Sequence, residues 1–167
     1  MLYLQFYVDG DRYIINTRHI LSVIPLLKMH KAAAYRGGLS SVCGHIHYNG
    51  QTIPVVDLNN LISGKKSKPY LSTRIVLTDY MPDKTRREIV GLMVEKATEV
   101  IKLTEANFAD SSIDSIRNGV KNSGENLDPF LGPMAKDSHG LLQQLNIHQV
   151  IEQKVINDIH MQASFIE

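Results

Sequence analysis

The dipeptide Asn49-Gly50, placed between two short apolar segments, constrains the fold of this chain more than any other feature. Both residues adopt positive φ readily, and a two-residue turn of this kind joins two antiparallel strands because its twist matches theirs. The flanking segments 44–48 and 52–56 therefore predict a β-hairpin. Pro54 has no amide proton to donate to a neighbouring strand, which places its strand at a sheet edge or at a bulge on that side.

Alternating apolar and polar residues predict strands along most of the remaining chain. Residues 2–8 alternate in this way, and Asp9-Gly10 is a second tight-turn signal. Thr17 and residues 104–108 indicate single helical turns, and Ile147 begins an apolar stripe typical of a helix that runs to about His160. The other predicted strands span 12–16, 72–80, 88–95, 97–103 and 141–145.

Two acidic or amide residues stand directly before predicted helices. Asp57 precedes an apolar run that ends near Gly64, and Asn146 precedes the C-terminal helix. Both residue types are good helix N-caps because the side-chain oxygen accepts a free amide proton of the first turn. The cap explains Asp57 better than a role as a general base does, because Asn146 holds the equivalent place without a charge.

Parts of the two halves resemble each other. Residues 12–24 are similar to residues 89–101, and residues 57–62 are similar to residues 146–151. Two similarities in the same order suggest a duplicated unit of about five strands. The sequence therefore predicts a pair of small antiparallel barrels, each of which closes off its own strand edges.

Composition narrows the classes of partner. The 167 residues carry a net charge of +1, which gives no electrostatic footprint for nucleic acid. Cys43 is the single cysteine, so an intramolecular disulfide and a cysteine-built zinc site are both excluded. The apolar start at residues 2–8 is too short to span a bilayer. We expect a cytoplasmic protein with no direct membrane insertion and no nucleic-acid partner.

The segment around the Asn49-Gly50 turn resembles the CheW-like domain of bacterial chemotaxis. That family has a glycine and a strand, then an Arg-Gly turn and a run similar to Ile-Pro-Val-Val-Asp-Leu. The matching residues here are Gly44, Gly50, Ile53, Pro54, Val55, Val56, Asp57 and Leu58. The resemblance continues through 74–77, 90–95 and the closing Gly140 strand and helix. It therefore implies one CheW-like domain over 1–167, with approximate sequence halves at 1–64 and 72–160.

The resemblance implies a mainly β fold of two intertwined five-stranded SH3-like barrels with short helices and a C-terminal helix. It implies a non-catalytic adaptor without a cofactor, which couples a methyl-accepting chemoreceptor to a histidine kinase at membrane-associated receptor arrays. In the family the first barrel meets the kinase regulatory domain, and the groove between barrels meets the receptor's cytoplasmic tip. The partner-binding residues expected by resemblance are Ile20, Ser22, Val23, Gly44, Asn49, Gly50, Arg74, Ile75 and Gly91.

Two positions depart from the family pattern. Asn49 stands where the family's turn has arginine, and Ser22 stands where a glutamate is common. Each change removes a charge-assisted contact of about 1.5–3 kcal/mol, which indicates a dedicated partner. The turn at residues 48–50, the entry at 71–74 and the stretch 130–133 look like the adaptors of Wsp-type surface-sensing systems.

Two other functions are considered. His45 and His47 lie two residues apart on a predicted strand and so share a face, which is half of a metal site, and Cys43 stands beside them. A metal or thiol enzyme would need a third ligand or an adjacent base, and the sequence shows neither. A regulatory module that binds a small ligand between the barrels is the other alternative.

Overall fold

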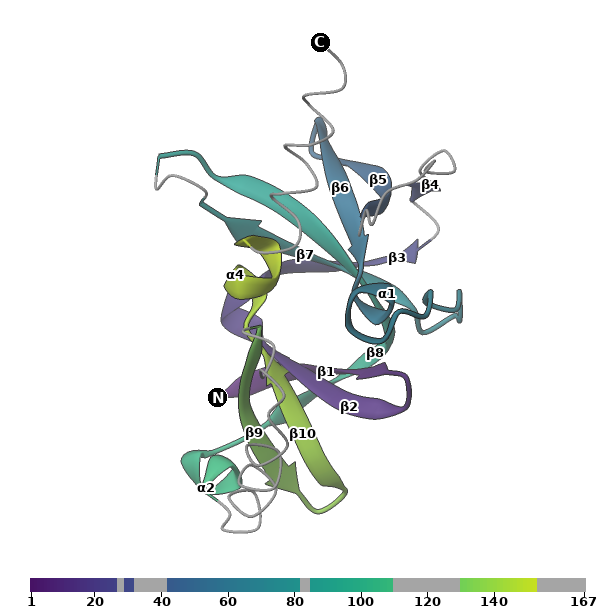
Figure 1. The fold of residues 1–167 in the computed structure, drawn as a ribbon. Helices are drawn as coiled ribbons and strands as arrows, with labels where there is room; N and C mark the ends of the chain where they lie inside the picture. The colour runs from purple at the N-terminus through teal and green to yellow at the C-terminus, as the bar shows by residue number, and fades with distance from the viewer. Residues whose placement is uncertain (27–28, 32–41, 82–84, 110–129, 153–167) are drawn as a thin grey trace.

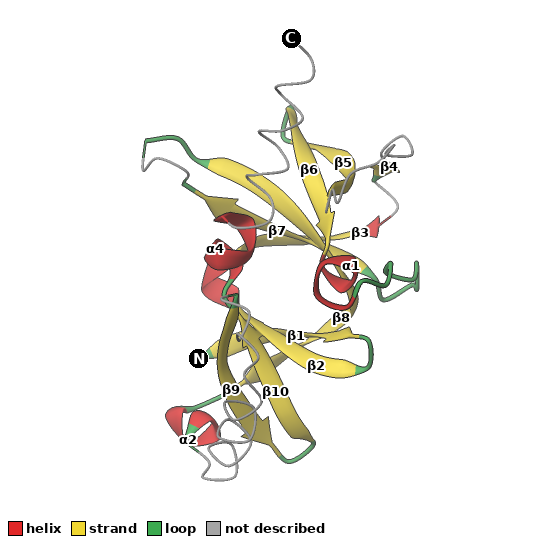
Figure 2. Cartoon of the chain, viewed as in Figure 1, coloured by secondary structure: helices red, strands yellow, loops and turns green. Residues whose placement is uncertain are grey.

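The computed structural model describes residues 1–26, 29–31, 42–81, 85–109 and 130–152. Strands account for most of the described chain, with short helical segments between them (Figure 2). The strands are β1 Leu2–Val8, β2 Asp11–Asn16, β3 Ile20–Pro25, β4 His30–Lys31, β5 Val42–Tyr48, β6 Gln51–Asp57, β7 Arg74–Tyr80, β8 Glu88–Lys102, β9 Leu131–Asp137 and β10 Gly140–Leu145. The helical segments are η1 Thr17–His19, α1 Leu58–Ser63, α2 Glu105–Phe108 and α4 Ile147–Val150.

The strands form two five-stranded units with the same pairing pattern (Figure 1). In the first unit, β5 pairs antiparallel with β6, β6 pairs parallel with β8, and β8 and β3 each pair antiparallel with β7. In the second unit, β9 pairs antiparallel with β10, β10 pairs parallel with β2, and β2 and β8 each pair antiparallel with β1. This repetition agrees with the duplicated unit that the sequence predicts.

The two units exchange strands. The chain leaves β2 of the second unit and enters β3 of the first through η1. Further on, β8 pairs with β7 of the first unit over Glu88 to Val94, and with β1 of the second unit over Glu95 to Lys102. The two segments that cross between units are therefore the ones whose sequences resemble each other, 12–24 and 89–101. The predicted intertwining is confirmed, and the sequence halves 1–64 and 72–160 do not coincide with the two units.

Three details differ from the sequence prediction. The strands expected at 88–95 and 97–103 are one continuous strand, β8, which bends at Lys96, where φ is 52°. The two-residue strand β4 pairs with β5 and was not predicted. The strand of Pro54 is not at an edge, because β6 lies between β5 and β8; the ladder to β8 begins only at Val55, so the missing amide interrupts no pair of that ladder.

A shared core joins the two units. The largest buried cluster takes Phe6 and Ile15 from the second unit, Val76 and Leu92 from the first, and further side chains from α1 and α4. Each unit also has a smaller cluster of its own. Because the larger cluster spans the junction, the units pack as one body. The helix predicted from Ile147 is described as far as Glu152, and its continuation to His160 lies outside the described residues.

Candidate partner-binding surface

All nine residues that the sequence assigns to partner binding lie in the first unit, and three of them are on its strand β3. On β3, Val23 is exposed, whereas Ile20 and Ser22 are partly buried. Asn49 and Gly50 form an exposed turn, and Arg74 at the start of β7 is partly buried. Gly44, Ile75 and Gly91 are buried.

Strand β3 presents apolar side chains to solvent. Its residues alternate between partly buried and exposed, and Leu21 and Val23 are each 40% exposed. The ladder with β7 shifts register between Ile20 and Ser22, which places a bulge at Leu21. In the described part of the chain β3 pairs along one edge only. An open strand edge with outward apolar residues can pair with a strand of another protein. The sequence missed Leu21.

The Asn49-Gly50 turn forms the tip of the β5–β6 hairpin. Both residues have positive φ, 48° and 76°, as a two-residue turn with matching twist requires. Both are exposed, and a Cβ added at Gly50 would meet no heavy atom within 4 Å. The turn is therefore accessible, and glycine is needed there for its backbone conformation.

Gly44, Ile75 and Gly91 are buried in the isolated chain, so they pack behind the surface that a partner could touch. Their part in partner binding stays a prediction. A Cβ on Gly91 would lie 2.8 Å from Cγ2 of Ile75 and 3.1 Å from Cγ2 of Val55. A Cβ on Gly44 would collide with the carbonyl oxygen of His30. Side chains at these glycines would push strands apart, because protein interiors have no spare volume.

Arg74 anchors a loop with an exposed apolar tip. Its Nη1 donates to the carbonyl oxygens of Leu71 and Thr73, and Arg74 pairs with Pro25 at the end of β3. Leu71 is 98% exposed, and neighbouring Tyr70 is 42% exposed. No periodic pattern marks this loop, so its exposed residues cannot be found from sequence alone.

Asp57 fixes the base of the same loop and caps α1. Its Oδ1 accepts from the amides of Asn59 at 3.0 Å and Asn60 at 3.2 Å. Ser67 donates its amide to Oδ2 at 2.8 Å and its hydroxyl to Oδ1 at 2.6 Å. The side chain of Asn146 caps α4 by accepting from the amide of Gln149 at 3.4 Å. Both residues thus make the N-caps expected of them, and Asp57 in addition ties the loop to the helix.

Cys43 is not placed to act as a nucleophile. Its Sγ donates to the carbonyl oxygen of Val55 at 3.4 Å and packs against the core of the first unit. Burial, with a smaller effect of the Asp57 charge, raises the pKa of the Cys43 thiol to about 12. The reactive form of cysteine is the thiolate, so a thiol mechanism at neutral pH has no support here.

Comparison with known proteins places the chain in a family. Residues 2–155 match the CheW-like domain family. The part of the chain that the structure describes contains no apolar helix of membrane-spanning length. The chain is 27% identical over 150 residues to Chemotaxis protein CheW of Bacillus subtilis (strain 168), which covers 89% of this chain and 85% of that protein. The crystal structure of scaffolding protein TtCheW from Thermoanaerobacter tengcongensis matches with a TM-score of 0.66 at 18% identity, covering 93% of this chain and 92% of the other. That match confirms the mainly β, SH3-like fold. The chain belongs to the CheW-like family and is, like the other members, a non-catalytic scaffolding adaptor.

Proposed function

We propose that this chain couples a methyl-accepting chemoreceptor to a histidine kinase in a chemotaxis-like two-component pathway. Membership of the CheW-like family gives the class of function. The observation that carries the proposal for this chain is the edge of β3 with which no other described strand pairs. Leu21 and Val23 are exposed there, next to the register shift between Ile20 and Ser22. Monomeric proteins usually protect such an edge, so its exposure favours a protein partner.

The kinase regulatory domain is the proposed partner of the first unit. Contact along β3 would cover Leu21, Ser22 and Val23. It would extend to Ile20 and Arg74, which lie at the two ends of the β3–β7 ladder. The exposed Asn49-Gly50 turn is a separate contact point, because β7 and β8 lie between β3 and the β5–β6 hairpin. Gly44, Ile75 and Gly91 would support these contacts from the core.

The receptor's cytoplasmic tip is the proposed partner at the junction of the units, where α1 and α4 lie (Figure 2). This assignment follows the family resemblance. The shared core supports it physically: a partner that touches both units pushes on one packed body and not on two independent ones. Localisation at membrane-associated receptor arrays follows from the same assignment.

The proposed mechanism is positioning. The adaptor holds receptor and kinase in a fixed geometry, and a receptor change alters kinase activity only if the adaptor contacts two kinase states differently. Contacts that are individually weak suffice when an array multiplies them, because each further contact is then intramolecular. Asn49 and Ser22 in place of the family's charged residues favour a dedicated partner. The assignment to Wsp-type surface-sensing systems stays a prediction.

Calorimetric titration with the regulatory domain of a histidine kinase from the same cell tests the proposal. Val23→Lys changes an exposed valine on β3, and Val100→Lys is the matched control because Val100 is an exposed strand valine, 55% accessible, on the second unit. We expect one-to-one binding that Val23→Lys weakens by on the order of tenfold or more, equal to about 1.4 kcal/mol, while Val100→Lys leaves it unchanged. Equal affinities for all three proteins would reject the β3 contact.

The same purified protein also tests the alternative function, a regulatory module that binds a small ligand. It predicts a rise in melting temperature with a small molecule and without any protein partner. The described core speaks against it, because seventeen buried side chains fill the junction between the units. Absence of binding to every histidine kinase of the cell would overturn the coupling proposal.

A further inference from the structure

Three histidines gather on the outer face of β4 and β5. The ring centroids of His30 and His45 are 5.5 Å apart, those of His30 and His47 are also 5.5 Å apart, and those of His45 and His47 are 5.8 Å apart. The family assignment and the proposed coupling function use none of the three. His30 supplies the third imidazole that the sequence could not show.

The strand register brings these rings together. His30 of β4 pairs directly with His45 of β5, and His47 lies two residues farther along β5 and so on the same face. His45 is partly buried, whereas His30 and His47 are exposed. Gly44 holds the arrangement, because any side chain there would collide with the carbonyl oxygen of His30 and displace β4.

The spacing suits a metal ion bound by three imidazoles. Zinc–nitrogen bonds of about 2.0–2.1 Å place the ring centroids of neighbouring ligands in a tetrahedral site roughly 5 Å apart. Imidazole is a good ligand for first-row divalent ions such as zinc, nickel and copper. The Nδ1 atom of His47 lies 3.2 Å from the hydroxyl oxygen of Thr52, which is the kind of partner that orients a ligating ring and leaves Nε2 for the ion.

The rings must turn before they share an ion. In the described residues, no three histidine, cysteine, aspartate or glutamate side chains are already arranged to hold a metal. Among the described residues, no protein group hydrogen-bonds the ring nitrogens of His30 or His45, so both rings can turn out of their mutual ring contact without breaking a hydrogen bond. Cys43, although near in sequence, packs into the core and is not part of the set.

We propose that His30, His45 and His47 together bind one divalent transition-metal ion, with zinc as the reference ion, through one ring nitrogen each. A fourth position is left for water. The bound ion fastens the two-residue strand β4 to the β5–β6 hairpin. It adds a structural site to a scaffold that performs no catalysis.

Zinc chloride titrated into untagged, chelator-treated protein tests the site by calorimetry. The informative variants are His30→Gln, His45→Gln and His47→Gln, because glutamine keeps a polar side chain and is a poor ligand for zinc. The matched control is His148→Gln, which breaks a histidine pair, His19 and His148, whose centroids are 4.9 Å apart but which has no third ring among the described residues. Melting curves in chelator show whether each variant folds as the wild type does.

We expect one zinc ion per chain and at least about a tenfold weaker affinity in each of the three variants, since loss of even an outer partner of a metal ligand costs about that much. His148→Gln should bind as the wild type does. Zinc should also slow amide hydrogen exchange at the β4–β5 pair. No saturable binding, or equal loss in His148→Gln, would overturn the proposal. The test uses the chain alone, so it stands or fails independently of kinase and receptor binding.

Discussion

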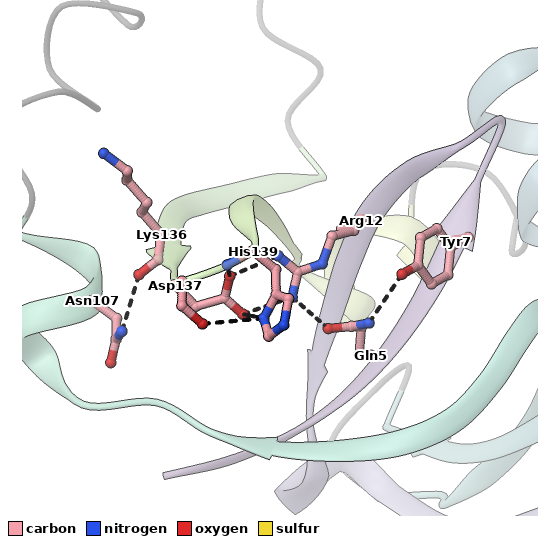
Figure 3. A network of polar contacts seen from close by, with 8 residues as sticks. Gln5, Tyr7, Arg12, Asn107, Lys136, Asp137 and His139 are labelled. Carbon is pink, nitrogen blue, oxygen red and sulfur yellow. Dashed lines mark hydrogen bonds and ion pairs between the residues drawn. The ribbon is translucent and has the colours of Figure 1, made fainter.

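Arg12 and Asp137 form a two-pronged ion pair that joins β2 to β9 (Figure 3). Nη1 of Arg12 lies 2.8 Å from Oδ1 of Asp137, and Nη2 lies 2.6 Å from Oδ2. The same Nη2 donates to Oε1 of Gln5 on β1 at 2.8 Å. The pair therefore ties three strands of the second unit, and its side chains are only 14% and 18% exposed.

Removing this pair should change the acid stability of the protein. The hydrogen bonds from Arg12 are the largest cause that lowers the pKa of Asp137 to about 2, from 3.8. A carboxylate with a lowered folded-state pKa stabilises the fold above its unfolded pKa and loses that effect as the pH falls toward the folded value. We expect Asp137→Asn to be less stable than wild type by about 2 kcal/mol at pH 7, with the difference fading between about pH 5 and pH 2. Urea unfolding at several pH values measures it.

Arg12→Lys serves as the control for geometry. Lysine keeps the positive charge but cannot present two parallel donors. We therefore expect the stability of Arg12→Lys to lie between those of wild type and Asp137→Asn. A difference between wild type and Asp137→Asn that stayed constant down to pH 2 would show that the carboxylate's charge does not matter.

Alanine in a strand usually gives a more stable protein than glycine does, and at Lys96 we expect the reverse. Its φ of 52° lies in the left-handed region, at the bend where β8 passes from one unit to the other. We expect Lys96→Gly to be more stable than Lys96→Ala by about 1 kcal/mol, because only alanine retains the Cβ that strains this conformation. Both variants lose the contacts of Nζ with the rings of Tyr7 and Tyr70, so chemical denaturation of the two isolates the backbone effect. Alanine equal to or better than glycine would contradict the strain.

The two N-caps should differ in strength. Asp57 is buried and accepts four hydrogen bonds, whereas Asn146 is exposed and its side chain accepts one at 3.4 Å. We expect Asp57→Ala to lower the free energy of unfolding by about 2–4 kcal/mol and Asn146→Ala by about 0.5–1 kcal/mol. Ser67→Ala, which keeps the cap and removes the hydroxyl donor, should fall between them. Equal losses at Asp57 and Asn146 would mean that the link to the loop adds nothing.

Cys43 should react slowly with thiol reagents until the protein unfolds. With the pKa of the thiol raised to about 12 by burial, the thiolate fraction at pH 8 is on the order of 10³-fold below that of an exposed cysteine. We expect native protein to react with an aromatic disulfide reagent slower by about that factor than protein in concentrated urea. A native rate near the unfolded rate would restore the thiol hypothesis.

The sequence predicted the elements that depend on local chemistry. Tight turns such as Asn49-Gly50 and caps such as Asp57 are set by a few neighbouring residues, so their conformation can be deduced from residue type. The burial of Ile75 and Gly91 could not be deduced in this way, because it depends on strands that are far apart in sequence. Strands β6, β7 and β8 meet around these two residues. Only part of the histidine cluster could be predicted from the sequence. His45 and His47 share a strand, whereas His30 is brought beside them by the pairing of β4 with β5.

The chain has the topology of a domain-swapped dimer whose two halves are covalently joined. The connection from β2 to β3 and the strand β8 each pass from one unit to the other. The first repeat supplies β1 and β2 to the second unit and β3, β5 and β6 to the first unit, so each unit contains strands of both repeats. Each repeat therefore completes the unit of the other, as two chains do in a swapped dimer.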